Sequence, residues 1–150
     1  MVVNLLFPRG CAGCDKPDEV LCEACRALFS QPTAQSFDGV AMQRWFACGW
    51  YRGTVRKAVL AWKDHGDEEC DRAFADAICA LAKASGVIDF VRDRHGSCHD
   101  VVVVPAPSSP ASIRRRGRKH MMPIAKHLAG FLREETGCEV TRSEERRVGK

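Results

Sequence analysis

The stretch that decides the fold is VVVVPAPSSPASIRRRGRKHMMPIAKHLAGFL, residues 101–132. Four β-branched residues at 101–104, bounded by proline, predict a strand buried on both faces of a parallel sheet. Pro105 and Pro107 lack the N–H that a central strand donates, so the strand should end there. Pro123 suits the first turn of a helix. The apolar face of that helix would contain Ile124, Leu128, Phe131 and Leu132.

A basic tract at 114–120 separates the strand from the helix, and we expect it to form a loop. Ligands of open parallel α/β sheets bind beyond the carboxyl ends of strands. Residues 101–150 carry 11 Lys and Arg against five Asp and Glu, whereas residues 1–100 carry 12 against 14. This local excess favours an anion site, most simply for phosphate, although a solvated basic loop is the alternative. The candidate phosphate ligands are Ser108, Ser109, Arg114, Arg115, Arg116 and Arg118.

Two C-x-x-C pairs near the N-terminus, Cys11 with Cys14 and Cys22 with Cys25, predict a structural zinc knuckle. Gly13 is expected to help the tight turn through a positive φ. Four thiolates leave no open coordination position, so a catalytic metal is not expected. The alternatives are unligated thiols or a disulfide pair, which a reducing compartment disfavours.

Weaker patterns predict the remaining elements. These are a linker at 30–39, one or two strands over 40–51 that are strongest at 44–51, helices at 54–64 and 67–85, a short apolar piece of undecided type at 87–91, and a second parallel strand at 138–141. Cys70 and Cys79 are interpreted as core residues of the second helix. A polar loop at 92–100 contains His95, Cys98 and His99, which we interpret as scattered ligand types without a second metal site.

The fold class expected is therefore α/β. A four-cysteine zinc module at 1–30 precedes an incomplete parallel sheet with flanking helices at 40–141, and 142–150 is expected to be a disordered or non-native tail. Two or three strands are few for an open sheet, so either a partner completes the fold or the chain is truncated, and we favour truncation. We see neither a membrane span nor a signal peptide, so a cytoplasmic location is expected.

Four pieces of the sequence together resemble the ComF family of phosphoribosyltransferase-like proteins, which are linked to DNA uptake in competent bacteria. They are Leu5-Leu6-Phe7-Pro8 before the cysteine quartet, Tyr51-Arg-Gly-Thr-Val-Arg with Leu60-Ala-Trp-Lys63, Val103-Val-Pro-Ala-Pro107, and Arg116-Gly117. The resemblance implies a phosphoribosyltransferase fold with an N-terminal zinc finger. It also implies that phosphoribosyl pyrophosphate binds together with Mg²⁺ in the full-length protein.

Two departures from that family pattern limit what the resemblance implies. Arg118-Lys119-His120 replaces the family's aromatic-Asn-Gln after Arg-Gly, and the acidic V-D-D-x-x-T-T-G-type loop is absent. We therefore expect this chain to bind phosphate without turnover. The alternative functions are a zinc-dependent module that binds single-stranded DNA and an adaptor for competence proteins. Trp45, Trp50 and Trp62 could stack bases, but their positions fit a core better.

Overall fold

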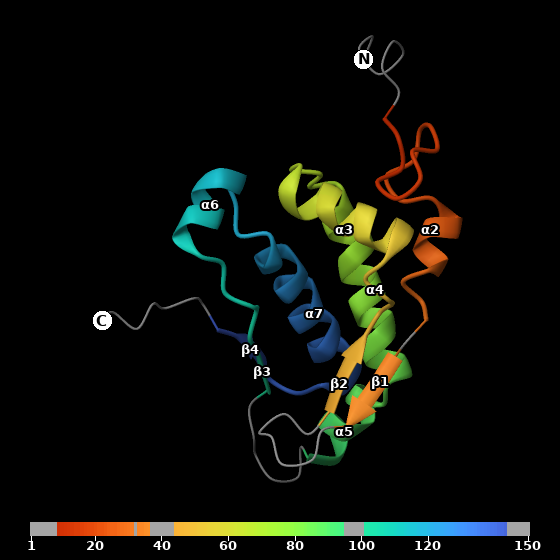
Figure 1. The fold of residues 1–150 in the computed structure, drawn as a ribbon. Helices are drawn as coiled ribbons and strands as arrows, with labels where there is room; N and C mark the ends of the chain where they lie inside the picture. Colours follow the sequence, from red (N-terminus) through yellow and green to blue (C-terminus); the bar gives the residue numbers. More distant parts are fainter. Residues whose placement is uncertain (1–8, 32, 37–43, 95–100, 144–150) are drawn as a thin grey trace.

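The computed structural model describes residues 9–31, 33–36, 44–94 and 101–143. Within these ranges it is a mixed α/β protein in which α3, α4 and α7 form the centre (Figure 1). The cysteine-rich segment lies at one end and α6 lies at the side of α7 (Figure 1). The elements in chain order are α2 (Glu23–Ala27), β1 (Thr33–Ser36), β2 (Arg44–Ala47), α3 (Gly53–Asp64), α4 (Cys70–Ala84), α5 (Val87–Arg94), β3 (Val101–Val103), α6 (Pro110–Arg116), α7 (Met121–Thr136) and β4 (Val140–Arg142).

The central prediction, a strand followed by a helix and a second parallel strand, is confirmed. β3 and β4 pair in parallel, with Val101 opposite Val140, and α7 packs against both strands. Gly137 ends α7 in the left-handed conformation at φ 71°. β4 extends one residue beyond the predicted strand end at 141, because Arg142 pairs with Val103, and the Ser143 N–H donates to the Val103 carbonyl at 3.0 Å. Backbone pairing tolerates a charged residue there because the Arg142 side chain is exposed.

The expected burial of residues 101–104 on both faces is wrong. Val102 is 51% exposed and Val104 is 70% exposed, while Val140 is completely buried. Among the described residues β3 pairs with β4 alone, and α7 covers the sheet on the opposite side from Val102. Parallel sheets normally have both faces covered. Here the face of β3 that carries Val102 is exposed and forms an apolar surface.

The expected linker at 30–39 is also wrong in part, because Thr33–Ser36 forms β1. It pairs antiparallel with β2, which places Thr33 opposite Ala47 and Ser36 opposite Arg44. The polar sequence Thr-Ala-Gln-Ser has no apolar alternation, so its strand character comes from backbone pairing with β2. β2 ends at Ala47, before the predicted end of that strand at residue 51.

The helices at 54–64 and 67–85 are confirmed with small shifts of their ends. Thr54 does not cap α3, which begins at Gly53 after Arg52, and α4 begins only at Cys70, after a turn over Asp67–Glu69. Cys70 and Cys79 are buried, as expected of core residues. The undecided piece at 87–91 belongs to helix α5. None of the described helices is long and apolar enough to cross a membrane.

The basic tract is not the predicted loop, because Arg114, Arg115 and Arg116 form the last turn of α6. Pro110 occupies the first turn of this helix, and the Ser109 hydroxyl caps it by accepting from the Ser112 N–H at 3.2 Å. Gly117, at φ 73°, ends it. Arginine has a high helix propensity and is favoured near the negative carboxyl end of a helix, which explains why this segment is helical.

Candidate metal centre and anion-binding cavity

The four predicted metal ligands converge on one point. The sulfur atoms of Cys11, Cys14, Cys22 and Cys25 all lie within 4.8 Å of one another, and the Sγ atoms of Cys14 and Cys22 are 3.6 Å apart. Zn–S bonds of about 2.3 Å in a tetrahedron place the sulfurs ~3.8 Å apart. The quartet therefore has the spacing needed to hold one metal ion, and it is the only such group of three or more ligands in the described ranges.

Backbone donors favour a thiolate at this site. Burial alone would raise the pKa of Cys11, but N–H groups of Cys22, Gly13 and Cys14 outweigh it and lower the pKa to about 6. The Cys22 N–H lies 3.2 Å from the Cys11 sulfur. Burial and the three neighbouring thiols raise the pKa of Cys25. A bound metal ion would stabilise the thiolate forms of the quartet.

Gly13 is required for close packing, which corrects the expected reason for this glycine. Its φ is not positive, but a Cβ there would lie 2.8 Å from the Cys25 sulfur and 2.8 Å from the Thr54 methyl group. The cysteine loop therefore lies directly on the start of α3. Cys11, Cys22 and Cys25 belong to the same buried cluster as Trp62 and Phe74. The cysteine quartet and the helices thus share one core.

A cavity of about 430 Å³ lies beyond the carboxyl end of β3, where the sequence predicts a ligand. Its walls come from α3, from the loop after β3, from α6 and from the start of α7. The polar side chains that line it are Lys63, Ser108, Ser109, Ser112, Arg116 and His120. Two hydroxyl-bearing serines and a guanidinium from the predicted list are therefore brought together, whereas Arg114, Arg115 and Arg118 lie outside the residues that line this cavity.

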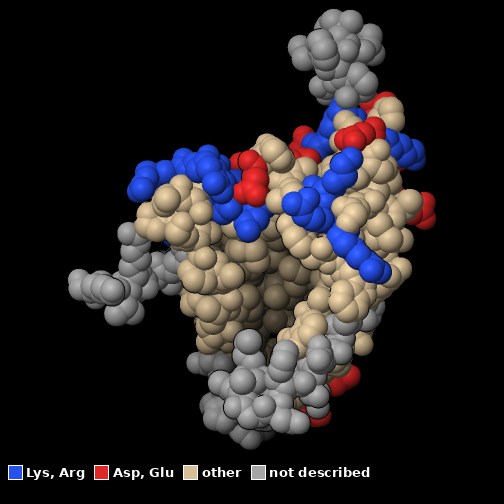
Figure 2. All heavy atoms as spheres, viewed as in Figure 1, with Lys and Arg blue, Asp and Glu red and all other residues tan. Residues whose placement is uncertain are grey.

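Carboxylates on α3 and α4 engage three of the predicted arginines. Basic side chains gather over α6, with acidic ones beside them toward α3 (Figure 2). Arg116, whose side chain is only 10% exposed, lies 2.9 Å from Asp64, and exposed Arg115 lies 3.5 Å from the same carboxylate. The hydrogen bond and charge of Arg116 lower the pKa of Asp64. Arg116 therefore has two possible anionic partners, Asp64 and a ligand in the cavity.

Arg118 is held away from the cavity by a partly buried polar network. Its guanidinium donates to Asp71 at 2.7 Å, and the indole N–H of Trp62 donates to the same carboxylate at 2.5 Å. Arg118 also lies 3.6 Å from Glu68. These bonds join the loop after α6 to α3 and α4, so Arg118 stabilises the walls of the cavity.

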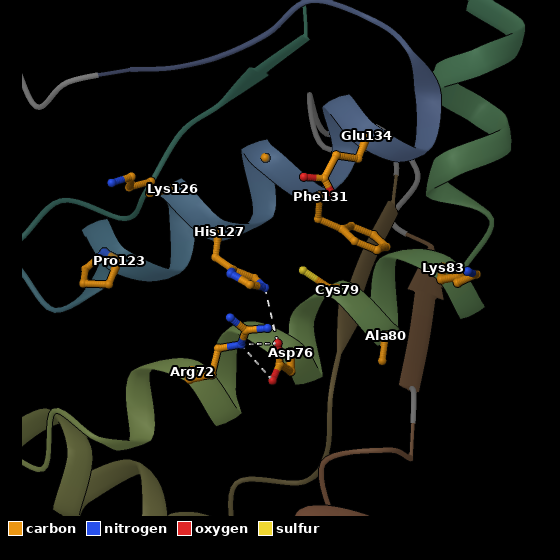
Figure 3. A pocket seen from close by; sticks show the side chains of 11 residues that line it. Arg72, Asp76, Cys79, Ala80, Lys83, Pro123, Lys126, His127, Phe131 and Glu134 are labelled. Atoms are coloured by element: carbon orange, nitrogen blue, oxygen red, sulfur yellow. Dashed lines mark hydrogen bonds and ion pairs between the residues drawn. The ribbon is translucent and has the colours of Figure 1, made fainter.

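Another cavity, of about 730 Å³, lies in a groove between α4 and α7 (Figure 3). Asp76 of α4 contacts Arg72 at 3.0 Å and His127 of α7 at 3.3 Å. Cys79 also lines this groove, and burial raises its pKa to about 11. Since the central charges are paired within the groove and the thiol is protonated at neutral pH, we assign no chemistry to this cavity.

Sequence reasoning missed Lys63, Ser112 and His120 as residues of the cavity at β3. Lys63 lies far before the loop in the sequence, and only the packing of the helices brings it there. His120 belongs to the basic tract, but its position at the start of α7 decides its burial. No local pattern in the sequence indicates that Lys63 or His120 lies at this cavity.

Several predictions lie outside the described residues. These are the Leu5-Leu6-Phe7-Pro8 element, the His95, Cys98 and His99 loop, and residues 144–150.

Comparisons of the chain with protein-family models, curated proteins and solved structures found no match. The ComF resemblance therefore stays a prediction that rests on the motifs themselves.

Proposed function

We propose that this protein binds a phosphate- or pyrophosphate-bearing ligand of the phosphoribosyl pyrophosphate type, next to a structural zinc centre, as in ComF-like phosphoribosyltransferases. The observation that carries the proposal is the cavity beyond β3, which combines Ser108, Ser109 and Arg116 from the predicted set. Hydroxyl and guanidinium donors at the carboxyl end of a parallel strand are suited to phosphate oxygens.

Charge and burial around the cavity support an anion as its ligand. Lys63 and Arg116 supply positive charge from two different elements, and Arg116 is largely withdrawn from water. A charge-assisted hydrogen bond to such a group contributes about 1.5–3 kcal/mol. Asp64, which pairs with Arg116, neutralises part of this charge, so an anion must compete with it for Arg116.

Zinc is the metal that best fits the cysteine quartet, because four sulfur ligands at tetrahedral spacing are the usual structural zinc set. When bound, zinc would supply folding energy to the loop at 11–25 and to the start of α3.

Magnesium fits the cavity beyond β3 less well than zinc fits the cysteine quartet. The acidic side chains near the cavity, Asp64 and Asp71, are paired with arginines. We therefore propose ligand binding and derive no catalytic step.

The test is calorimetric titration of the zinc-loaded chain with pyrophosphate, comparing the native protein with Arg116→Ala. We expect binding that weakens about tenfold or more in the variant, the equivalent of one lost charge-assisted contact. Arg72→Ala is the matched control, because Arg72 is an exposed arginine on α4 with a carboxylate partner. The proposal is wrong if pyrophosphate does not bind, or if both variants bind like the native chain.

A second candidate, binding of single-stranded DNA, is favoured by one observation. Trp50, which the sequence places in the core, is instead 61% exposed, beside exposed Tyr51, with the Arg52 guanidinium 6.0 Å above its ring. Exposed aromatics next to cations can stack bases. A salt titration of single-stranded DNA binding tests this. A steep salt slope together with loss of affinity in Trp50→Ala would favour DNA, and salt-independent or undetectable binding would exclude it.

A further inference from the structure

His120 is buried at the wall of the cavity with one ring nitrogen unpaired. The residue is only 7% exposed, and its ring meets the Trp62 ring edge-on, with centroids 5.0 Å apart. Its Nδ1 atom is buried without a hydrogen-bond partner among the described residues. An unsatisfied buried polar atom costs about 1–3 kcal/mol, and most such atoms in native proteins have a partner.

The same side chain lines the cavity that contains Ser108, Ser109 and Arg116. Since Nδ1 has almost no accessible surface, a ligand would meet the part of the ring that lines the cavity, near Arg116. We propose that His120 is a ligand-contacting residue of the cavity, whose imidazole bonds an oxygen of the bound phosphate group and takes up a proton as the anion binds. This inference rests on the proposed function.

The charges around His120 give the direction of the proton coupling. Burial, followed by the nearby cations Arg116, Lys63 and Arg118, lowers the pKa of His120, while Asp64 opposes the shift. On the α4 side, Asp71 and Glu68 face Arg118 and partly neutralise it. The imidazole is therefore neutral at pH 7.

A dianion placed between Arg116 and His120 reverses this balance, because it favours the imidazolium form. The pKa of His120 then rises on binding, so the complex carries more protons than the free protein. Affinity for an anion of constant charge must increase as the pH falls and decrease as it rises through the pKa of the complex. A rise of one pKa unit would change the affinity up to about tenfold.

The test uses sulfate, whose charge is constant between about pH 5.5 and 8, so the ligand itself does not titrate in this window. Titration calorimetry of the zinc-loaded chain at several pH values, in two buffers of different ionisation enthalpy, gives the affinity and the protons taken up. We expect sulfate to bind several-fold more tightly at pH 6 than at pH 8, with net proton uptake.

His120→Gln keeps an N–H donor but cannot titrate, so it should still bind sulfate and lose the proton uptake. His120→Leu should bind more weakly at every pH. His127→Gln is the matched control, because His127 lies on the same helix, outside the cavity, and pairs with Asp76. Circular dichroism verifies that each variant is folded.

The possible results separate this inference from the proposed function. If native protein binds sulfate and Arg116→Ala does not, but His120→Gln retains the pH dependence, the role of His120 is wrong and the anion site stands. If neither sulfate nor pyrophosphate binds to the native protein, both proposals are overturned.

Discussion

Replacing Asp71 with alanine should destabilise the protein far more than any exposed ion pair does. Asp71 accepts hydrogen bonds from the Trp62 indole and the Arg118 guanidinium, at 2.5 and 2.7 Å. Asp71→Ala removes one charge-assisted bond, worth about 1.5–3 kcal/mol, and leaves the buried Trp62 N–H unsatisfied, at about 1–3 kcal/mol. Arg118 is 14% exposed and keeps Glu68 nearby, so the combined loss should fall near the lower end, about 3 kcal/mol.

Urea unfolding of the zinc-loaded chain, followed by circular dichroism, measures this loss. Asp71→Asn keeps an acceptor for Trp62 and should lose roughly half as much. Arg72→Ala removes an exposed helical pair and should change the unfolding free energy by less than about 0.5 kcal/mol. A loss of less than about 1 kcal/mol in Asp71→Ala would refute this reasoning, because the network would then contribute no more than a surface pair.

The remaining predictions concern the metal centre, the sheet and one ion pair. Gly13→Ala, with its methyl group 2.8 Å from the Cys25 sulfur, should weaken metal binding measured by competition with a chelator, while Gly130→Ala, which meets open space, should not. Removing the metal with a chelator should expose Trp62 as well as the cysteine loop, seen as a shift in tryptophan emission, because both belong to one core. Val140→Ala should lose about 2 kcal/mol on urea unfolding and Val102→Ala less than about 0.5 kcal/mol, since only Val140 is buried. Arg116 lowers the pKa of Asp64, so their pair stabilises the protein at neutral pH and weakens as the pH falls through that lowered pKa; carboxyl NMR titration of Arg116→Ala should show the Asp64 midpoint moving upward.

The elements with a strong local signal were predictable from the sequence. Residues 101–104 are β-branched and followed by Pro105, and the apolar residues of α3, α4 and α7 recur at helical spacing. The cysteine quartet was predictable for the same reason, because two C-x-x-C pairs constrain four ligands within a short loop. Local composition thus located the cysteine quartet and the loop beside the cavity.

Features that depend on distant partners were not predictable. β1 is polar and exists as a strand through its pairing with β2. The basic tract looks available to a ligand in the sequence, yet Asp64 and Asp71, from separate helices, engage Arg115, Arg116 and Arg118. Such pairs form only when α3, α4 and α6 are packed together, and no local pattern encodes that packing.

The most direct test of the proposed anion site is to map pyrophosphate binding by amide NMR on the zinc-loaded, isotopically labelled chain. We predict that the largest shifts fall in two segments, 108–112 and 116–121, which line the cavity beyond β3. Lys63 should shift as well, because it lies on the same cavity. Shifts confined to the groove between α4 and α7, or to residues 50–57, would contradict the proposed site, as would the absence of any shift.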